Sequence, residues 1–363
     1  MAAAGKPQVL KQYNTSMIQR LIMEKGPITK PELSHLTNLS LPTVNKIVDE
    51  LVTEKIVMED MIQTGAGAGR KAMAYVVNGN YGTFVTLYYL DEKWIGCVSN
   101  ILGEVLFKAE YYINSDHKKE ELEFLTAAVD DLMVNAERVK AIGVGIPGIV
   151  MNDEKIAAIP QLPEFEGINL KKLFQEKYQL PVFIENDVKL MTVGYYSCRM
   201  KNLNNMVFLY IGNGIGGGTI INGQLYKGNT CFAGEFGYIP SGQEETEEEF
   251  PGGSLEKRLT SLKKEMKKPD QREKAKSQFC TEIGRALVSC AAIINPEAVV
   301  LYCKELDKEA LQVISHEIEK FLPQHSIPQI YLTANNNYGI LGLIHMCQEG
   351  INPKMQLLDT IEK

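Results

Sequence analysis

The chain contains 363 residues, of which 45% are hydrophobic and 23% are charged, and it carries a net charge of −7. This composition predicts a globular protein with a full core and two or three domains, and it excludes a uniformly basic nucleic-acid-binding surface. The seven cysteines show no C-x-x-C spacing and no stretch is long and apolar enough to cross a membrane, so we expect a cytoplasmic protein with reduced thiols.

The charge is unevenly distributed along the chain. Residues 1–80 contain nine Lys and Arg against seven Asp and Glu, whereas the rest of the chain contains 29 against 38. A weakly basic head on an acidic body fits a DNA-binding module attached to a sensor.

The first elements predict a helix-turn-helix. An amphipathic helix is predicted over residues 14–23, a short helix over 30–37, a turn at 38–40, and a second helix that starts near Leu41. Pro42 stands in the first turn of that helix, where its missing N–H costs nothing. Apolar residues recur at helical spacing and are expected to bury against each other: Leu33, Leu36, Leu39, Val44, Ile47, Val48 and Leu51.

The other face of the second helix carries small polar groups and one cation, which suit base edges and phosphates in a major groove. We expect DNA contacts from Ser40, Pro42, Thr43, Asn45 and Lys46. The helix lacks Arg and Gln at its start, so shape readout or other contacts are expected to supply part of the specificity. A protein-interaction module with the same pattern is the alternative.

A strand, a glycine-rich turn and a second strand with Ala74, Val76 and Val77 follow this helix. Three helices and a hairpin make a winged helix. Arg70 and Lys71 would stand at the wing tip against phosphate or the minor groove.

From residue 81 the pattern changes to strands alternating with helices, which predicts an α/β body. Strands are predicted at 83–90, 94–100, 102–107, 139–150, 181–187, 204–226, 297–304 and 327–333. Helices are predicted at 121–138, 170–179, 281–296 and 339–347.

Three strand ends carry candidate site residues. Gly148 ends a G-I-P-G turn, where glycines allow close approach of a ligand or simply form a tight turn. Asn186 and Asp187 follow a strand and could hydrogen-bond hydroxyl groups, supply a base, or cap a helix. A glycine-rich hairpin at 212–226 could lie against phosphates, and Glu235 stands between glycines just after it.

This order of motifs, from the winged helix through GIPG, ENDxxL, GxGIGGGxIINGxLYxG, AGEFG and INPEAVVL, resembles the ROK family (repressors, open reading frames and sugar kinases) in its repressor branch. The resemblance implies a winged helix-turn-helix followed by a two-lobed actin-like, ribonuclease H-like ATPase/sugar-kinase fold. It implies a DNA-binding domain at 1–79, a first lobe at 80–193 plus about 340–363, and a second lobe at 194–339.

The resemblance also implies a sugar site between the lobes. In kinase members the Asp at the position of Asp187 is the general base that deprotonates a sugar hydroxyl. The implied sugar-binding set is Gly148, Asn186, Asp187, Glu235, Tyr238 and Glu256.

Two departures from the family pattern stand out. Tyr238 replaces the family's zinc-binding His, and no cysteine follows it up to Glu256, so we expect no zinc; residues 244–249 are expected to form a solvated acidic loop. The Asp-x-Gly-x-Thr phosphate turn is replaced by LYYLDEKWIG, with bulky Tyr89, Leu90 and Trp94, and the strand after INPE ends without the glycines that receive adenine.

Only the glycine hairpin remains of the nucleotide elements, so ATP and Mg²⁺ are not expected. We interpret this hairpin as a vestigial phosphate motif formed by Gly212, Gly214, Gly216 and Gly217.

The sequence therefore predicts a non-enzymatic, sugar-responsive transcriptional regulator, a repressor of carbohydrate-utilisation genes. Its expected partners are operator DNA, a sugar effector and further copies of the chain in a homodimer or homotetramer. The alternatives are an active ATP-dependent sugar kinase with a DNA-binding appendage, a DNA-binding protein with a vestigial sugar site, and a regulator that answers to a protein partner.

Overall fold

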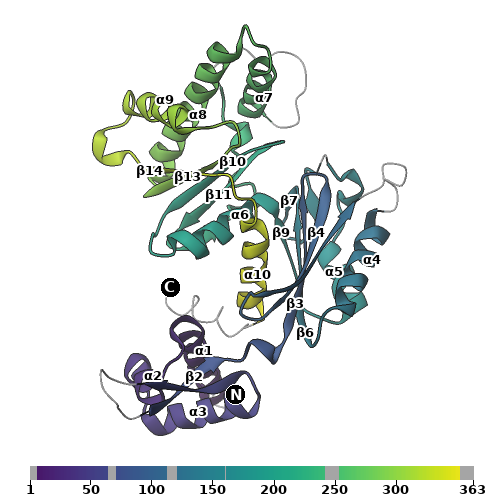
Figure 1. The fold of residues 1–363 in the computed structure, drawn as a ribbon, viewed down its shortest axis with the longest axis vertical. Helices are drawn as coiled ribbons and strands as arrows, with labels where there is room; N and C mark the ends of the chain where they lie inside the picture. Colours follow the sequence, from purple (N-terminus) through teal and green to yellow (C-terminus); the bar gives the residue numbers. More distant parts are fainter. Residues whose placement is uncertain (1–5, 64–70, 113–120, 160, 242–252, 352–363) are drawn as a thin grey trace.

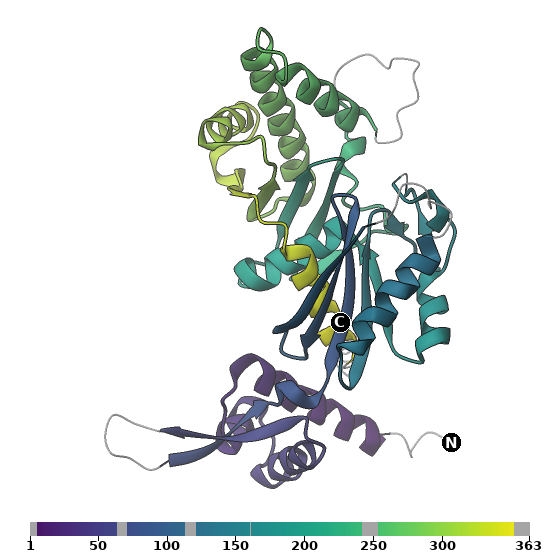
Figure 2. The same ribbon diagram turned by 45° about the vertical axis from the view of Figure 1, so that its right-hand side comes forward.

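The structure is a computed structural model that describes residues 6–63, 71–112, 121–159, 161–241 and 253–351. Its N-terminal head consists of α1 (Lys6–Lys25), α2 (Lys30–Thr37), α3 (Leu41–Thr53), β1 (Val57–Gln63) and β2 (Lys71–Val77). Strands β1 and β2 pair in antiparallel fashion and form the predicted wing, which extends away from the helices (Figures 1 and 2). The head is therefore a winged helix-turn-helix.

Local sequence signals determine where the head's helices begin and end. Thr29 and Glu32 form a reciprocal capping box at the start of α2, Asn38 ends it in the left-handed conformation, and the Ser40 hydroxyl caps α3. The expected apolar core forms, with one error: Leu36 is 44% exposed. Helix α2 is only two turns long and buries Leu33 and Thr37 instead, one turn apart on its inner face.

The body contains two five-stranded sheets of mixed direction. The strands of the first sheet, in spatial order, are β5 (Val105–Tyr112), β4 (Lys93–Asn100), β3 (Thr83–Leu90), β6 (Val139–Ile146) and β9 (Val182–Asn186). Those of the second are β12 (Gln224–Tyr226), β11 (Ile215–Ile221), β10 (Met206–Ile211), β13 (Ala298–Tyr302) and β14 (Gln329–Thr333). Each predicted strand of the body is present.

Helices cover both faces of each sheet. In the first lobe, α4 (Glu121–Val134) and α5 (Leu170–Tyr178) pack on one face. In the second, α7 (Ser254–Met266), α8 (Arg272–Ile294) and α9 (Lys308–Glu319) cover the face turned away from the first lobe. Helix α4 ends four residues before the predicted boundary because the chain turns there into β6, and α8 begins earlier than predicted.

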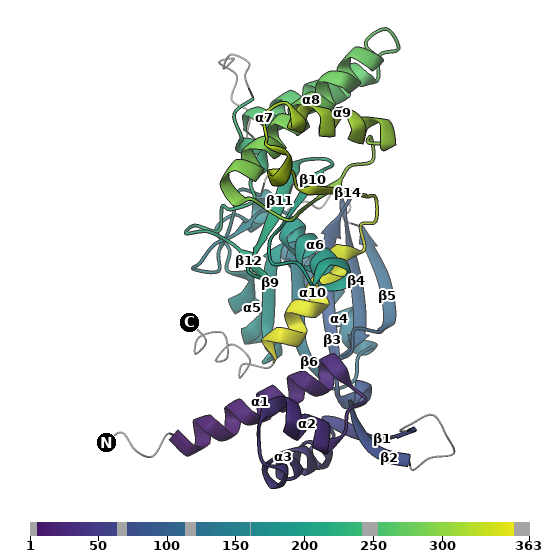
Figure 3. The ribbon, with the colours of Figure 1, turned by 90° about the vertical axis from the view of Figure 1, so that its left-hand side faces the viewer.

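Helices α6 (Asp187–Tyr195) and α10 (Tyr338–Gly350) lie between the two sheets and share one apolar core with both (Figures 1 and 3). They cross through glycines: a Cβ on Gly342 would lie 1.9 Å from the carbonyl oxygen of Leu190, and one on Gly194 would lie 1.9 Å from that of Tyr338. The two backbones therefore touch directly. No helix of the described residues is long and apolar enough to cross a membrane.

Candidate functional site

The residues expected to contact DNA gather at the N-terminal end of α3. Ser40, Pro42 and Lys46 are exposed, and Thr43 and Asn45 are partly exposed. The Ser40 hydroxyl lies 2.8 Å from the Thr43 hydroxyl and also accepts a hydrogen bond from the Thr43 N–H. Ser40 thus has a structural role as a helix cap, while Thr43 and Asn45 present polar groups and Lys46 presents a cation to solvent.

Two carboxylates near this face are neutralised by lysines of neighbouring helices. Lys11 of α1 approaches Glu50 at 2.8 Å, and Lys30 of α2 approaches Asp49 at 2.6 Å. Such pairing reduces the repulsion that free carboxylates would exert on phosphates. At the wing, Arg70 lies outside the described residues, and Lys71 begins β2 with a side chain that is not described.

The second group of expected site residues surrounds the start of α6. Asn186 ends β9 and caps α6: its side-chain oxygen accepts from the Lys189 N–H at 2.9 Å, and its amide donates to the Gly148 carbonyl at 2.9 Å. Gly148 has φ +131°, which only glycine adopts readily. The capping interpretation of Asn186 is therefore confirmed, and this cap fixes the position of Asp187.

Three carboxylates from distant parts of the chain interact at this point; we call Asp187, Glu235 and Glu256 the carboxylate cluster. Burial raises the pKa of Asp187 to about 7, and the charge of Glu235 adds to this rise. Burial likewise raises the pKa of Glu256 to about 7. Burial also raises the pKa of Glu235, although Lys189 opposes that shift. Carboxylates whose pKa values are raised by burial and by one another are typical of sites that bind or deprotonate hydroxyl groups.

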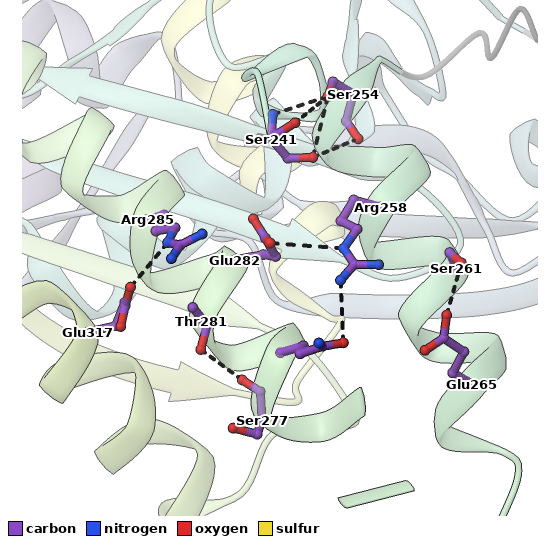
Figure 4. Close-up of polar contacts among 11 residues, drawn as sticks. Ser241, Ser254, Arg258, Ser261, Glu265, Ser277, Thr281, Glu282, Arg285 and Glu317 are labelled. Carbon is purple, nitrogen blue, oxygen red and sulfur yellow. Dashed lines mark hydrogen bonds and ion pairs between the residues drawn. The ribbon is translucent and has the colours of Figure 1, made fainter. Parts of the chain in front are cut away.

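The second lobe carries two of these carboxylates, and polar contacts near them fix the segments on which they stand; Figure 4 shows the Ser241–Ser254 and Arg258–Glu282 contacts. Glu235 precedes the short helix η5 (Phe236–Tyr238), and Glu256 lies in the first turn of α7. The Ser241 N–H donates to the Ser254 hydroxyl at 3.1 Å, which joins the end of the Glu235 segment to the start of α7. Arg258, 3.9 Å from Glu282, fixes α7 against α8.

Tyr238 ends η5 and lies at the surface. Its side chain is 46% exposed and its ring lies 5.1 Å from that of Phe232. The acidic segment 244–249 lies outside the described residues. Within the described ranges, no group of three His, Cys, Asp or Glu side chains could hold a metal ion.

Sequence reasoning did not identify Lys189, although it lies beside Glu235. Its side chain is only 1% exposed, and its ammonium group donates a short hydrogen bond to the Cys231 carbonyl. Glu185 is similarly buried and pairs with Lys227 at 2.5 Å. Both contacts attach the segment that follows β12 to the start of α6. The only sequence signal was a lysine in the first turn of a helix whose other residues are largely apolar.

The glycine hairpin has a packing explanation of its own. A Cβ on Gly217 would lie 2.3 Å from the Phe236 ring, and one on Gly216 would lie 3.3 Å from Val188. Gly214 faces Glu256, whose carboxylate would lie 3.3 Å from an added Cβ, and Gly212 faces the Tyr210 hydroxyl. These glycines therefore leave room for neighbouring side chains of the protein itself, so their presence does not require a bound phosphate.

Between the lobes lies a set of buried or half-buried rings, Tyr88, Tyr210 and Tyr302, which we call the tyrosine cluster. Tyr210 and Tyr302 stack with ring centroids 4.9 Å apart, and the Tyr88 hydroxyl donates to the Asp187 carbonyl at 3.1 Å. Burial raises the pKa of Tyr88 far above its usual range. Aromatic side chains thus occupy the region where β3, β10 and β13 face one another.

The raised pKa of Glu256 leads to a testable prediction about stability. Because the folded protein binds this proton more tightly than the unfolded chain, this carboxyl favours folding below about pH 4.5, and the contribution is lost as the pH rises toward 7. Glu256→Gln should therefore raise the melting temperature more at pH 8 than at pH 5, as measured by differential scanning calorimetry.

Glu176→Gln is the matched control, because Glu176 is exposed on α5 and pairs weakly with Lys172. Its melting-temperature difference should be the same at both pH values. A Glu256→Gln difference that does not change with pH would show that this carboxyl is not perturbed by burial.

Two family models match this chain. The one described as ROK family covers residues 92–349, and the one described as winged helix-turn-helix DNA-binding covers residues 14–58. The xylose repressor of Bacillus subtilis (strain 168) is 29% identical over 238 residues, which are 63% of this chain and 61% of that protein. The N-acetylglucosamine repressor of Escherichia coli O157:H7 is 24% identical over 256 residues, 66% of this chain and 60% of that protein. The chain thus spans about 60% of the length of the curated relatives it matches.

Solved structures share the fold. A ROK family transcriptional regulator, a homolog of the E. coli MLC protein, has a TM-score of 0.78 at 18% identity and covers 98% of this chain, with 100% of its own chain matched. The ROK hexokinase from Thermus thermophilus has a TM-score of 0.62 at 19% identity over 76% of this chain and 99% of its own. The winged helix followed by an actin-like body is therefore an arrangement already known from solved proteins.

Proposed function

The chain belongs to the ROK family, and we propose that it is a sugar-responsive transcriptional repressor that binds operator DNA through α3 and the wing. The observation that carries this proposal is the presence, in one chain, of a winged helix and of three interacting carboxylates with raised pKa values. Carboxylates of this kind accept hydrogen bonds from sugar hydroxyls. The relatives named for xylose and N-acetylglucosamine support these sugars as the first ligands to test.

Within this proposal the sugar lies against the carboxylate cluster, with Gly148 and Asn186 shaping its surroundings and Tyr238 at the exposed rim. The head would be residues 1–79, the first lobe 80–193 plus about 340–363, and the second lobe 194–339. Packing of α10 on β3 and β6 supports its assignment to the first lobe. Recognition of paired half-sites would require a symmetric homo-oligomer.

We propose further that the body has lost kinase activity. At the place of the family's phosphate turn, β3 and β4 are joined at Asp91 and Glu92, and Lys304 of the second lobe approaches Asp91 at 3.9 Å. Tyr89 and Trp94 flank this turn as a buried edge-to-face pair. Tyr88 of the tyrosine cluster lies on the other face of this sheet, in the core shared with the second lobe, and the cluster's rings there argue against a bound nucleotide and its magnesium ion. The alternative of an active kinase is favoured by one observation, the pKa of about 7 for Asp187, which suits a general base.

The proposal is tested with the full-length protein and a duplex that it selects from a random DNA library. At least one sugar among D-xylose, N-acetylglucosamine and D-glucose should change the Kd for this duplex by about 5- to 150-fold, which is the usual range of allosteric coupling. Fluorescence anisotropy at fixed salt measures the Kd, and Thr43→Asp, which places a negative charge at the DNA-facing end of α3, should abolish binding.

A coupled assay with ATP and the same sugars distinguishes the kinase alternative. No turnover is expected. ATP-dependent phosphorylation that disappears in Asp187→Asn would establish the kinase instead, and unchanged operator affinity with every sugar would refute sugar responsiveness.

A further inference from the structure

Helix α6 connects the carboxylate cluster to the other end of the body. It begins at Asp187 and continues without interruption into the π-helix η4 (Tyr196–Met200), so the two together extend about 20 Å. Lys201 follows directly and leads into β10 of the second lobe. A helix that is buried along most of its length transmits displacement of one end to the other with little internal adjustment.

Helix α10 ends in the same region but packs on the first lobe. Near its end, His345 lies 3.3 Å from Glu349 across one turn. Lys201 therefore belongs to a segment that leads to the second sheet, whereas Glu349 belongs to a helix on the first sheet. A movement of the second lobe that carries the segment after α6 with it would alter the relative position of these two side chains.

Helix α1 of the head lies against this end of the body (Figure 3). The Glu24 carboxylate lies 3.0 Å from Arg20 and 3.6 Å from Lys201. Attraction from His345, and also from Arg20 and Lys201, lowers the pKa of Glu349. We call Arg20, Glu24, Lys201 and Glu349 the junction cluster. It joins the head to the segment that leads into the second lobe, and it brings the end of α10 within electrostatic range of Arg20 and Lys201.

Helix α1 in turn is attached to the helix that faces DNA. Ile18 and Ile22 are buried in the same apolar core as Val44 and Val48 of α3. Lys11 of α1 pairs with Glu50 of α3 at 2.8 Å. Rotation of α1 therefore carries α3 with it.

We propose that the junction cluster transmits lobe movement from the carboxylate cluster through α1 to α3, with Lys201 as the residue that positions the head according to the state of the second lobe. This inference rests on the proposed function. The Lys201 and Glu24 side chains are 61% and 32% exposed, so their ion pair contributes little to stability. We expect this ion pair to affect the orientation of the head and not the stability of the protein. The two effects can be measured separately.

The test compares wild type with Lys201→Met, using the selected duplex and D-xylose, N-acetylglucosamine and D-glucose as probes. The variant should keep the melting temperature and the sugar affinity of wild type, measured by calorimetry. Its ratio of operator Kd values with and without sugar should fall roughly 2- to 30-fold, the range by which residues between coupled sites alter coupling. Glu349→Gln should reduce the ratio in the same direction.

Lys177→Met is the matched control, because Lys177 is 43% exposed and pairs with Asp130 at 2.7 Å on the outer face of the first lobe. It should leave the ratio unchanged. If Lys201→Met has the same ratio of operator Kd values with and without sugar as wild type, the proposed transmission through the junction cluster (the relay) is overturned. The proposed function would remain intact.

If no sugar changes the operator affinity of wild type, the proposed function fails, and the relay is judged by hydrogen exchange of full-length protein with and without the duplex. DNA binding should alter exchange in residues 196–203 and 345–351 of wild type and not in Lys201→Met. Unaltered exchange in these segments of wild type would overturn the relay as well.

Discussion

Gly342→Ala should destabilise the body by about 3 kcal/mol or more, which corresponds to a decrease of roughly 6 to 12 °C in melting temperature. The added methyl would lie 1.9 Å from the Leu190 oxygen and 2.9 Å from the Gly194 nitrogen. Both are backbone atoms of α6, which is itself packed between the sheets, so neither can move aside. The clash outweighs the gain of about 1 kcal/mol that alanine normally brings to a helix interior.

Gly284→Ala in α8 provides the comparison, since its methyl would mainly meet the Glu317 side chain, at 2.8 Å from Cβ and 3.1 Å from Cγ. The Glu317 Cβ is fixed to the backbone of α9, but an approach of 2.8 Å is far milder than one of 1.9 Å, and a small outward shift of α9 relieves it, so this variant should lose less stability. Both are measured by thermal and urea unfolding. Equal melting temperatures for Gly342→Ala and wild type would mean that the α6–α10 crossing is wider than the structure has it.

Asp187→Ala should weaken sugar binding by roughly 10- to 150-fold, the effect of removing a hydrogen-bonding charged partner. Asp187 is fixed by the Asn186 cap, and its own oxygen accepts from the Val188 N–H at 2.8 Å, so its orientation is set before a ligand arrives. Operator affinity without sugar should match wild type, because the residue lies far from the head. Isothermal titration calorimetry with D-xylose and N-acetylglucosamine measures the loss.

Asp131→Ala is the matched control: it removes an exposed carboxylate that accepts from the Tyr111 hydroxyl on the first lobe. It should bind sugar as wild type does. Asp187→Ala with wild-type affinity would place the sugar elsewhere, and reduced operator affinity without sugar would assign Asp187 to the fold of the body instead.

The carboxylate cluster also implies a compromise between stability and binding. Three carboxyl groups with raised pKa values repel one another when ionised, and Lys189 compensates only in part. A polyhydroxy ligand would replace the water that burial removes. Replacing a carboxylate of this cluster by a neutral side chain is therefore expected to stabilise the protein and to weaken sugar binding. The Glu256→Gln variant tests the first of these effects.

The sequence predicted the fold well because its signals are local. The capping pair Thr29 and Glu32, the cap at Ser40 and the alternating strands are each readable within a few residues. Helices α7 and α9 were not predicted, although their buried apolar residues recur at helical spacing: Leu255, Leu259 and Leu262 in α7, and Ala310, Ile314 and Ile318 in α9. Leu36 was wrongly predicted to be buried because helical spacing alone does not show which of two adjacent helix faces packs against the rest of the head.

By itself, then, the sequence determined the winged helix, the strand order along the chain and the residue types of the carboxylate cluster, since motif order and hydrophobic period are carried by consecutive residues. Only the tertiary structure decided that Asn186 caps α6, that Lys189 lies buried beside Glu235, and that Lys201 reaches Glu24. The last two contacts join residues far apart in the chain, for which no periodic signal exists, and the cap was one of several roles that the sequence left open for Asn186. Burial, which sets the pKa of Asp187, exists only once both lobes are packed around α6.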